Sequence, residues 1–451
     1  MKTILFDILQ ATGHLNASFD IACRLQSAGN RVVYCGGKES ELIVKSRGFE
    51  YFIIEIQSLL PDDVELKTKG FVFFLECFFS LFTKARQQRF LEAISNYEAA
   101  IQEISPDYII LDIQCSMKTI IYHHLNILFI YIETMPLSLY DPWIPPFTSG
   151  LIPTKTKFSR VRIFLAWQLT VAKKHLHHFT SAFFLFGQDS FSLFRKLATK
   201  YHFPFREKLD LKRPFITCFK DVDILSMPPS CFDFPRKFNT NCYYAESSID
   251  LLREKTIVNK RYLTIMKKIR LQKELQDNMR IIYCSMGTVT QGFYKRLGTF
   301  FRKIKKVSLS NPHYIFIISI GMEYDATLLL PHSTNMYIFQ HVPQLDMLSH
   351  SDLMITHGGM NSIAECIKME TPMLVLPLSR EWDQPGNAAK VVYHGIGLRA
   401  DIQMDSPQNI EKKIDQIMQN NSYFKQNLSR MNEKMSATSQ NAPSWWNLLQ
   451  F

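Results

Sequence analysis

Short, mostly apolar runs alternate with amphipathic stretches from the start of the chain. Residues 2–8, 31–36 and 51–56 are more continuously apolar than a strand with one solvated face, which is typical of parallel strands covered on both sides. We expect a tight turn over residues 11–17, followed by a helix over 18–28 that ends at a glycine. Strand, helix and strand in this order predict a doubly wound α/β domain.

The remainder of the first half continues this pattern with longer helical stretches. We predict one or two helices over residues 71–104, a strand over 107–112, a loop over 136–158 that is rich in Pro and aromatic residues, helices within 160–205 and an extended segment near 223–229. Residues 249–278 are charged and have helical spacing, so the joint between two domains is predicted just before them.

The second half repeats the architecture of the first. The predicted strands are 280–285, 314–320, 337–339, 353–356 and 373–377, and the predicted helices are 292–309, 345–350 and 387–394. The sequence thus predicts two Rossmann-like α/β sheets facing a cleft, with domains at 1–243 and 244–430. The apolar end Ser444–Phe451 is unsuited to a free tail, so we expect a tail helix at 431–451 that packs back on the first domain.

Amino-acid composition bears on the cellular compartment of the protein. The nine cysteines are odd in number and form no C-x-x-C pair, which favours a reduced, cytoplasmic chain without disulfides or metal-thiolate sites. The N-terminus has no secretory signal, and no apolar run is long enough to span a bilayer. The net charge of +11 fits either a solvated basic surface or peripheral contact with an anionic membrane, and no nucleic-acid motif occurs.

The run Phe71–Phe82 is the most aromatic stretch of the chain. Its composition suits a buried core helix. It also suits the lining of a pocket for a long apolar ligand or a segment that dips into a membrane surface. The sequence leaves these interpretations open.

A turn with two glycines joins a predicted strand to a predicted helix at Thr356–Glu365. Backbone N–H groups and the positive end of the helix would meet at this turn, where a phosphate is stabilised. Asn361 and Ser362 add side-chain donors in the first helical turn. Glu365 lies one turn beyond Asn361 on the same face and suits the hydroxyls of a ribose.

Several motifs around this turn resemble the nucleotide-sugar signature of the family 1 UDP-glycosyltransferases. They occur in one order at close spacing: Val342-Pro-Gln344, Thr356–Glu365, Pro372–Pro377 and Asp383–Ala388, with Ser285-Met-Gly-Thr288 and Gly13-His14-Leu15 as further matching loops. The segment Asp383–Gly397 is most similar to the zeaxanthin (carotenoid) glucosyltransferase branch. The resemblance is strong over 280–400 and weaker over 1–135, and it implies the two-domain GT-B fold.

The resemblance also implies roles for individual residues. His357, Gly359, Asn361 and Ser362 would hold the diphosphate, Glu365 the ribose, Asp383 and Gln384 the sugar, and Ser285, Gly287 and Thr288 the phosphate side of the cleft. Val342, Gln344 and His341 would surround the base. His341 stands where many relatives have Trp, and Glu370 stands where relatives usually have Gly.

A general base for an acceptor hydroxyl is predicted in the first domain. His14 follows the first strand and Asp112 ends a later one, so both can reach the floor of the cleft. A histidine whose other ring nitrogen is held by a carboxylate suits this task, and the pair matches the catalytic dyad of the family. Asp221-Val-Asp223 and the histidines near 175–178 have no ligand pattern that indicates metal, and no cofactor is implied beyond the UDP-sugar donor.

The resulting expectation is an inverting transferase that moves a sugar, expected to be glucose, from UDP to a hydroxyl of a lipophilic molecule such as a carotenoid. Two alternatives share the fold: a nucleotide-sugar epimerase or hydrolase, and a non-catalytic nucleotide-sugar-binding protein. Neither the acceptor, the regiospecificity nor the oligomeric state follows from the sequence.

Overall fold

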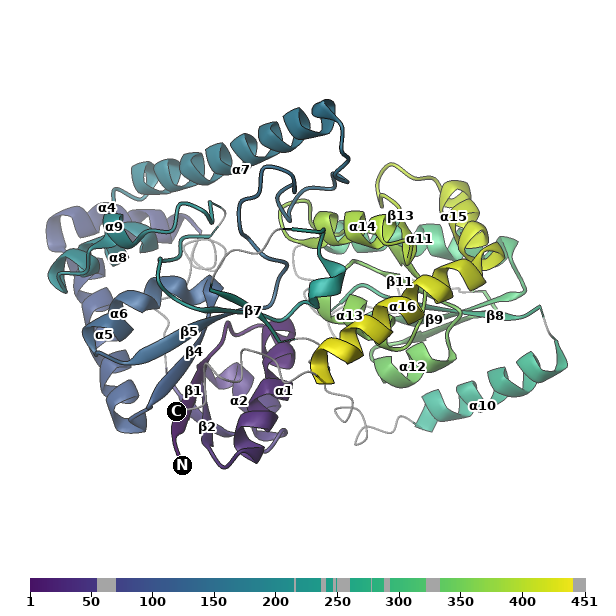
Figure 1. Cartoon of the computed structure of the whole chain (residues 1–451), viewed down its shortest axis with the longest axis horizontal. Coiled ribbons are helices and arrows are strands. Elements are labelled where there is room, and N and C mark those ends of the chain that lie inside the picture. The colour runs from purple at the N-terminus through teal and green to yellow at the C-terminus, as the bar shows by residue number, and fades with distance from the viewer. Residues whose placement is uncertain are drawn as a thin grey trace. The chain divides into compact units, whose positions relative to one another are not determined.

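The computed structural model describes residues 1–54, 70–214, 216–236, 241–245, 249, 260–276, 278–287, 293–321 and 333–440. The chain forms two compact units, each with a parallel sheet between helices (Figure 1). The first unit comprises Met1–Ile144, Thr156–Met227 and Lys237–Tyr243, and the second comprises Pro145–Lys155, Pro228–Arg236 and Tyr244–Phe451. Two short segments from within residues 1–243 therefore belong to the second unit.

The first unit contains a seven-stranded sheet in the order β3-β2-β1-β4-β5-β6-β7. Its strands are β1 (Thr3–Asp7), β2 (Arg31–Gly36), β3 (Glu50–Ile53), β4 (Tyr108–Asp112), β5 (Leu128–Glu133), β6 (Ile224–Ser226) and β7 (Cys242–Tyr244). Its helices are α1 (Thr12–Ser27), η1 (Lys38–Ser40), α2 (Glu41–Lys45), α4 (Phe71–Thr83), α5 (Ala85–Ile104), η3 (Ile113–Lys118), α6 (Thr119–His124), α7 (Lys157–Phe184), α8 (Ser190–Lys200) and α9 (Phe205–Lys208). The chain order reverses between β1 and β4, where open α/β sheets hold their ligands.

The second unit contains a six-stranded parallel sheet in the order β10-β9-β8-β11-β12-β13. Its strands are β8 (Arg280–Ser285), β9 (Tyr314–Ser319), β10 (Met336–Phe339), β11 (Leu353–Thr356), β12 (Met373–Val375) and β13 (Gly397–Arg399). Its helices are η4 (Ser230–Phe232), α10 (Lys260–Leu275), α11 (Tyr294–Ser310), α12 (Gln344–His350), α13 (Met360–Lys368), α14 (Gln384–Tyr393), α15 (Pro407–Gln419) and α16 (Asn421–Gln440). Here the order reverses between β8 and β11.

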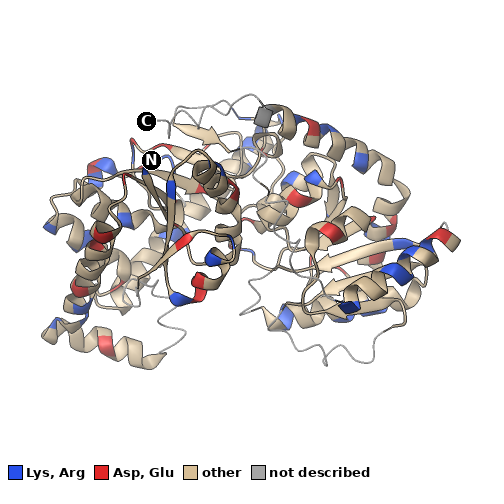
Figure 2. Ribbon diagram, turned by 90° about the horizontal axis from the view of Figure 1, so that it is seen from below, with Lys and Arg blue, Asp and Glu red and all other residues tan. Residues whose placement is uncertain are grey.

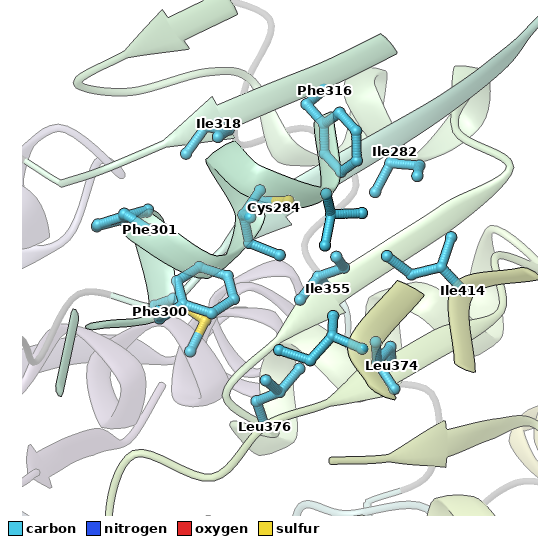
Figure 3. Close-up of a cluster of buried hydrophobic side chains, with 14 of the residues drawn as sticks. Ile282, Cys284, Phe300, Phe301, Phe316, Ile318, Ile355, Leu374, Leu376 and Ile414 are labelled. Atoms are coloured by element: carbon cyan, nitrogen blue, oxygen red, sulfur yellow. The ribbon is translucent and has the colours of Figure 1, made fainter. Parts of the chain in front are cut away.

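Continuous apolar strands are buried on both faces, as the sequence predicts for a parallel sheet. On β8, Ile282 and Cys284 point to the cluster formed with α11 and α15, which Figure 3 shows. Ile281 and Tyr283 point to the opposite cluster, formed with α10, α12, α13, α14 and α16. Helices thus cover both faces of this sheet and hold the ends of its strands in place.

The run Phe71–Phe82 does not form a buried core helix. It forms α4, and only Phe73, Cys77 and Ser80 of this helix are buried. The high apolar content of the run therefore lies mostly at the surface. Lys and Arg, in contrast, are spread over both units (Figure 2).

The predicted tail at 431–451 is described only as far as residue 440. Leu428, Met431 and Met435 of α16 pack in the same cluster as α13 of the second unit. The apolar end Ser444–Phe451, which was expected to meet the first domain, lies outside the described residues.

Candidate functional site

His14 lies in the first turn of helix α1, close to the carboxyl end of β1. The expected tight turn over residues 11–17 is wrong, because α1 begins at Thr12. The carbonyl of Ala11 accepts hydrogen bonds from the N–H groups of His14 at 2.9 Å and Leu15 at 3.1 Å. Ala11 has no side chain that can cap a helix, so the sequence carries no signal for this start.

The imidazole of His14 is held by the buried carboxylate of Asp112 at the end of β4. His14 Nδ1 lies 2.6 Å from Asp112 Oδ2 and 2.9 Å from Thr134 Oγ1. The Asp112 carboxylate also accepts hydrogen bonds from the backbone N–H groups of Leu9 at 3.3 Å and Gln114 at 3.0 Å. An acceptor-only carboxylate at Nδ1 favours the tautomer with the proton on that nitrogen, which puts the lone pair on Nε2.

A second buried carboxylate, that of Asp7 at the end of β1, holds several side chains near Asp112 in place. It accepts hydrogen bonds from Tyr97 at 2.7 Å and Tyr122 at 2.6 Å and pairs with Lys118 at 2.7 Å. Burial alone would lower the pKa of Lys118, but the Asp7 carboxylate more than offsets it and the pKa is raised. Because Lys118 is the last residue of η3, the ion pair ties the end of this segment to the end of β1. An acid within an apolar strand was the only sign of this cluster in the sequence.

In the second unit, the loops after β8 and β11 lie side by side because Ser285 and Thr356 are partners in the sheet. Gly287 and Gly358 adopt φ of +81° and +89°, a region that favours glycine. A Cβ at Gly287 would lie 2.4 Å from the His357 ring, and one at Gly359 would lie 2.5 Å from it. Gly287 and Gly359 therefore make room for the imidazole directly before the N-terminus of α13.

His357 combines a partly exposed ring with a buried Nδ1. That atom has no hydrogen-bond partner among the described residues. Desolvation lowers the pKa of His357 to about 4, so the ring is neutral at physiological pH. It can donate one N–H to an anion but carries no charge of its own. The positive charge at this point comes from the N-terminus of α13, where helical N–H groups lack partners within the helix.

Four side chains on neighbouring elements form a polar cluster beside this turn. Gln344, at the start of α12, donates to Glu365 Oε2 at 2.7 Å and to Ser362 Oγ at 3.2 Å. Tyr283 donates to Gln344 Oε1 at 3.2 Å. The structure thus brings together three residues that were predicted separately, and it adds Tyr283, which lies in an apolar strand and carries no signal in the sequence.

Asp383 and Gln384 begin helix α14 and are both buried. Gln384 Oε1 accepts hydrogen bonds from the N–H groups of Leu378 and Ser379 at 2.8 and 2.9 Å, which leaves its amide nitrogen for other partners. Asn387 Nδ2 donates to Asp383 Oδ2 at 2.8 Å and to the Gly358 carbonyl at 2.9 Å. Asn387 therefore ties this pair to the glycine turn, a positioning role that the sequence did not reveal.

The remaining predicted residues have varied surroundings. His341 is exposed after β10, whereas Val342 is buried in the core of the second unit. Asn361 lies partly buried in the first turn of α13, and Thr288 lies outside the described residues. Glu370 has a φ of +53° where α13 ends, which explains why glycine is usual at this position.

The described residues also bear on metal binding and on membrane crossing. No three His, Cys, Asp or Glu side chains in the described ranges are grouped as they would be around a metal ion. In the same part of the chain, none of the helices has both the length and the apolar character needed to cross a membrane. His175, His177 and His178 lie on α7, where His178 stacks on Phe191.

Comparison with known proteins finds a family model and relatives that match part of the chain. Residues 302–442 match the model of the glycosyltransferase family 28 C-terminal domain. The chain is 33% identical over 184 residues to a zeaxanthin glucosyltransferase of Pantoea ananas and 28% identical over 205 residues to one of Pseudescherichia vulneris. These alignments cover 41% and 45% of this chain and 39% and 43% of the relatives, so the chain matches less than half the length of each.

The likeness in fold covers nearly the whole chain. The structure aligns with the glycotransferase of kitacinnamycin at a TM-score of 0.61 and 19% identity, over 97% of this chain and 95% of the other. It aligns with CalG4, the calicheamicin glycosyltransferase, at a TM-score of 0.61 and 14% identity, over 97% and 94%. The predicted GT-B fold of two Rossmann-like units is thereby confirmed.

Proposed function

Because the chain is a relative of the family 1 glycosyltransferases, and of their carotenoid glucosyltransferase branch in particular, we propose that it transfers a sugar from a nucleoside diphosphate to an acceptor hydroxyl. The donor proposed is UDP-glucose, since several relatives are named UDP-glucosyltransferases. The observation that carries the proposal is the 2.6 Å contact between His14 and Asp112 at the reversal point of a parallel sheet.

In the proposed reaction, His14 is the general base. Its Nε2 lone pair takes the proton of the acceptor hydroxyl as the acceptor oxygen attacks the anomeric carbon. Asp112 holds the ring in the required tautomer and stabilises the imidazolium that forms. The bond between the anomeric carbon and the diphosphate oxygen breaks with its electron pair on that oxygen, so the configuration at the carbon is inverted.

The second unit supplies the proposed donor site. The diphosphate would lie at the N-terminus of α13 and accept hydrogen bonds from helical N–H groups, Asn361, Ser362 and the neutral ring of His357. These donors stabilise the negative charge that develops on the leaving group. Glu365, oriented by Gln344, would accept hydrogen bonds from the ribose hydroxyls.

Asp383 and the amide nitrogen of Gln384 would bind the hydroxyls of the sugar in the same donor site. Gln384 is suited to this because two backbone N–H groups fix the direction of its amide. The proposed acceptor is a lipophilic alcohol of the carotenoid class, which would be met at a membrane surface.

The test is product analysis by mass spectrometry after incubation of the protein with UDP-glucose, with and without a carotenoid diol. A mass increase of one hexose on the diol, together with release of UDP, supports the proposal. Conversion of UDP-glucose without acceptor indicates an epimerase or hydrolase. Binding of UDP with no turnover in any mixture indicates a binding protein. Either of the last two results overturns the proposal.

A further inference from the structure

Helix α7 is long and is buried only along a narrow strip. It spans Lys157–Phe184, and its buried residues are Ser159, Ile163 and Trp167, all in the N-terminal half. Figure 1 shows it lying along the outside of the first unit, with α4 near one of its ends. Most of its surface is therefore available to another molecule.

An apolar stripe runs along the exposed side of α7. Its members are Val161, Leu165, Leu169, Leu176, Phe179 and Phe183, and each is between 54% and 67% exposed. Separations of three, four and seven residues place them on one face of the helix. Ile163 and Trp167 lie about half a turn away from this stripe, so the stripe points away from the unit that carries the helix.

Helix α4 extends the apolar area at the C-terminal end of α7. Phe74 and Phe78 of α4 contact the ring of Phe186 at centroid distances of 5.3 and 5.4 Å, two residues beyond the end of α7. Phe79 and Phe82 of α4 are 58% and 76% exposed. We call the exposed apolar side chains of these two helices the α4–α7 surface.

The charged side chains of α7 are all basic. Helix α7 contains three lysines and two arginines but no Asp or Glu. Arg162 and Lys173 are exposed on α7 itself. The acid of α4, Glu76, lies 3.5 Å from Arg89. An exposed apolar stripe flanked by cations is typical of helices that lie in the interface of an anionic bilayer.

We propose that the α4–α7 surface docks the protein on a bilayer that contains anionic lipid, with α7 lying in the plane of the interface. The apolar stripe enters the boundary between headgroups and acyl chains, and the lysines and arginines contact lipid phosphates. A second copy of the chain is a poorer occupant, because pairing of α7 with itself would bring two cationic helices together. The proposal of membrane docking rests on the proposed function in one respect only: the benefit of docking would be access to a lipophilic acceptor.

The test is co-sedimentation of the full chain with vesicles of phosphatidylcholine alone or mixed equally with phosphatidylglycerol, in the absence of any donor. We expect binding to the anionic vesicles and much weaker binding to the neutral ones. The variant Leu169→Gln/Leu176→Gln should lower the partition coefficient by about tenfold or more, since glutamine keeps the helix but not the apolar stripe. Arg162→Glu/Lys173→Glu should lower it by about tenfold or more as well.

Matched controls carry the same changes in the second unit. Leu263→Gln/Leu271→Gln alters two leucines of α10 that are 49% and 53% exposed, and Arg302→Glu/Lys306→Glu alters two exposed cations of α11. Both controls should bind vesicles like the wild type. All variants should retain the wild-type circular dichroism spectrum and Tm.

Three results would overturn the proposal. The first is that the wild type does not bind anionic vesicles, and the second is that the α7 variants and the controls lose vesicle binding equally. The third is that the wild type self-associates and that Leu169→Gln/Leu176→Gln converts it to a monomer without a change in lipid binding. Transfer to a water-soluble alcohol is measured separately. Failure of transfer therefore contradicts the proposed function without affecting the vesicle result.

Discussion

Gly287 offers a selective way to disturb the proposed phosphate site. Its φ of +81° disfavours a side chain, and a Cβ there would lie 2.4 Å from Cε1 of His357. The variant Gly287→Ala must therefore move the imidazole, whose Cε1–Nε2 edge also faces Gly359. Loss of its hydrogen bond to a phosphate is worth about 1.5–3 kcal/mol, so UDP should bind about 10- to 100-fold more weakly.

The effect of backbone strain alone must be measured separately, and the variant Gly321→Ala serves as this control. This glycine also has a φ of +81° and follows strand β9 of the same sheet, but no atom of the described residues lies within 4 Å of the position that a Cβ would occupy. Both alanine variants should lose about 1–2 kcal/mol of stability from the left-handed conformation. Only Gly287→Ala should also lose affinity for UDP.

The assay is isothermal titration of UDP into wild type, Gly287→Ala and Gly321→Ala, with urea denaturation of each protein. Equal affinity of the two variants for UDP would contradict the proposed contact between His357 and the phosphate. A larger loss of affinity in Gly321→Ala would contradict it as well, since that variant leaves His357 undisturbed.

Three further predictions concern single residues. Asp112→Asn should lower kcat about 10³- to 10⁴-fold by favouring the wrong tautomer of His14 while leaving the Kd for UDP unchanged, and a loss under tenfold in steady-state kinetics would contradict this. The pKa of His357 is about 4 in the fold and near 6.5 when unfolded, so the unfolded chain binds more protons between these values and stability should fall as pH drops through this window. His357→Gln should remove that part of the dependence of Tm on pH, and an unchanged slope of Tm against pH in this variant would contradict the prediction. Glu370→Gly should raise the free energy of unfolding by about 1 kcal/mol because φ at this position is +53°, and urea denaturation with a lower midpoint would be the contrary result.

The sequence predicted the two sheets from local pattern, whereas most residues of the candidate site were implied by the resemblance to the family 1 UDP-glycosyltransferases. Continuous apolar strands indicate a parallel sheet, and residues at the carboxyl ends of adjacent strands must lie near one another. His14 and Asp112 follow this rule across β1 and β4, and so do Ser285 and Thr356 across β8 and β11. The sequence predicted that His14 and Asp112 both reach the floor of the cleft, but which strands are neighbours in each sheet came from the structure.

What the sequence could not predict depends on contacts between distant residues. The segment 228–236 belongs to the second unit because Asp233 pairs with the buried Lys390 of α14 at 3.3 Å. The segment 145–155 belongs there because the backbone of Phe147 approaches Gly386 so closely that a Cβ would overlap it. Neither of these two contacts can be recognised in the local sequence pattern.

The run Phe71–Phe82 illustrates a different limit. Apolar content reports how readily a side chain leaves water, but it does not say whether protein or another phase receives it. Seven residues of α4, including Phe71 and Phe82, are exposed large hydrophobics. Only the three-dimensional arrangement separated this surface from a core.

The role of His14 as the group that accepts the proton of the acceptor hydroxyl can be measured in one experiment. Hexose transfer from UDP-glucose to the acceptor is compared for wild type and His14→Ala, together with the Kd of each for UDP. We predict that transfer falls by about 10³-fold or more while the Kd is unchanged, because the base is lost and the donor site is left intact. Transfer by His14→Ala within a few-fold of the wild-type rate would show that His14 is not the general base.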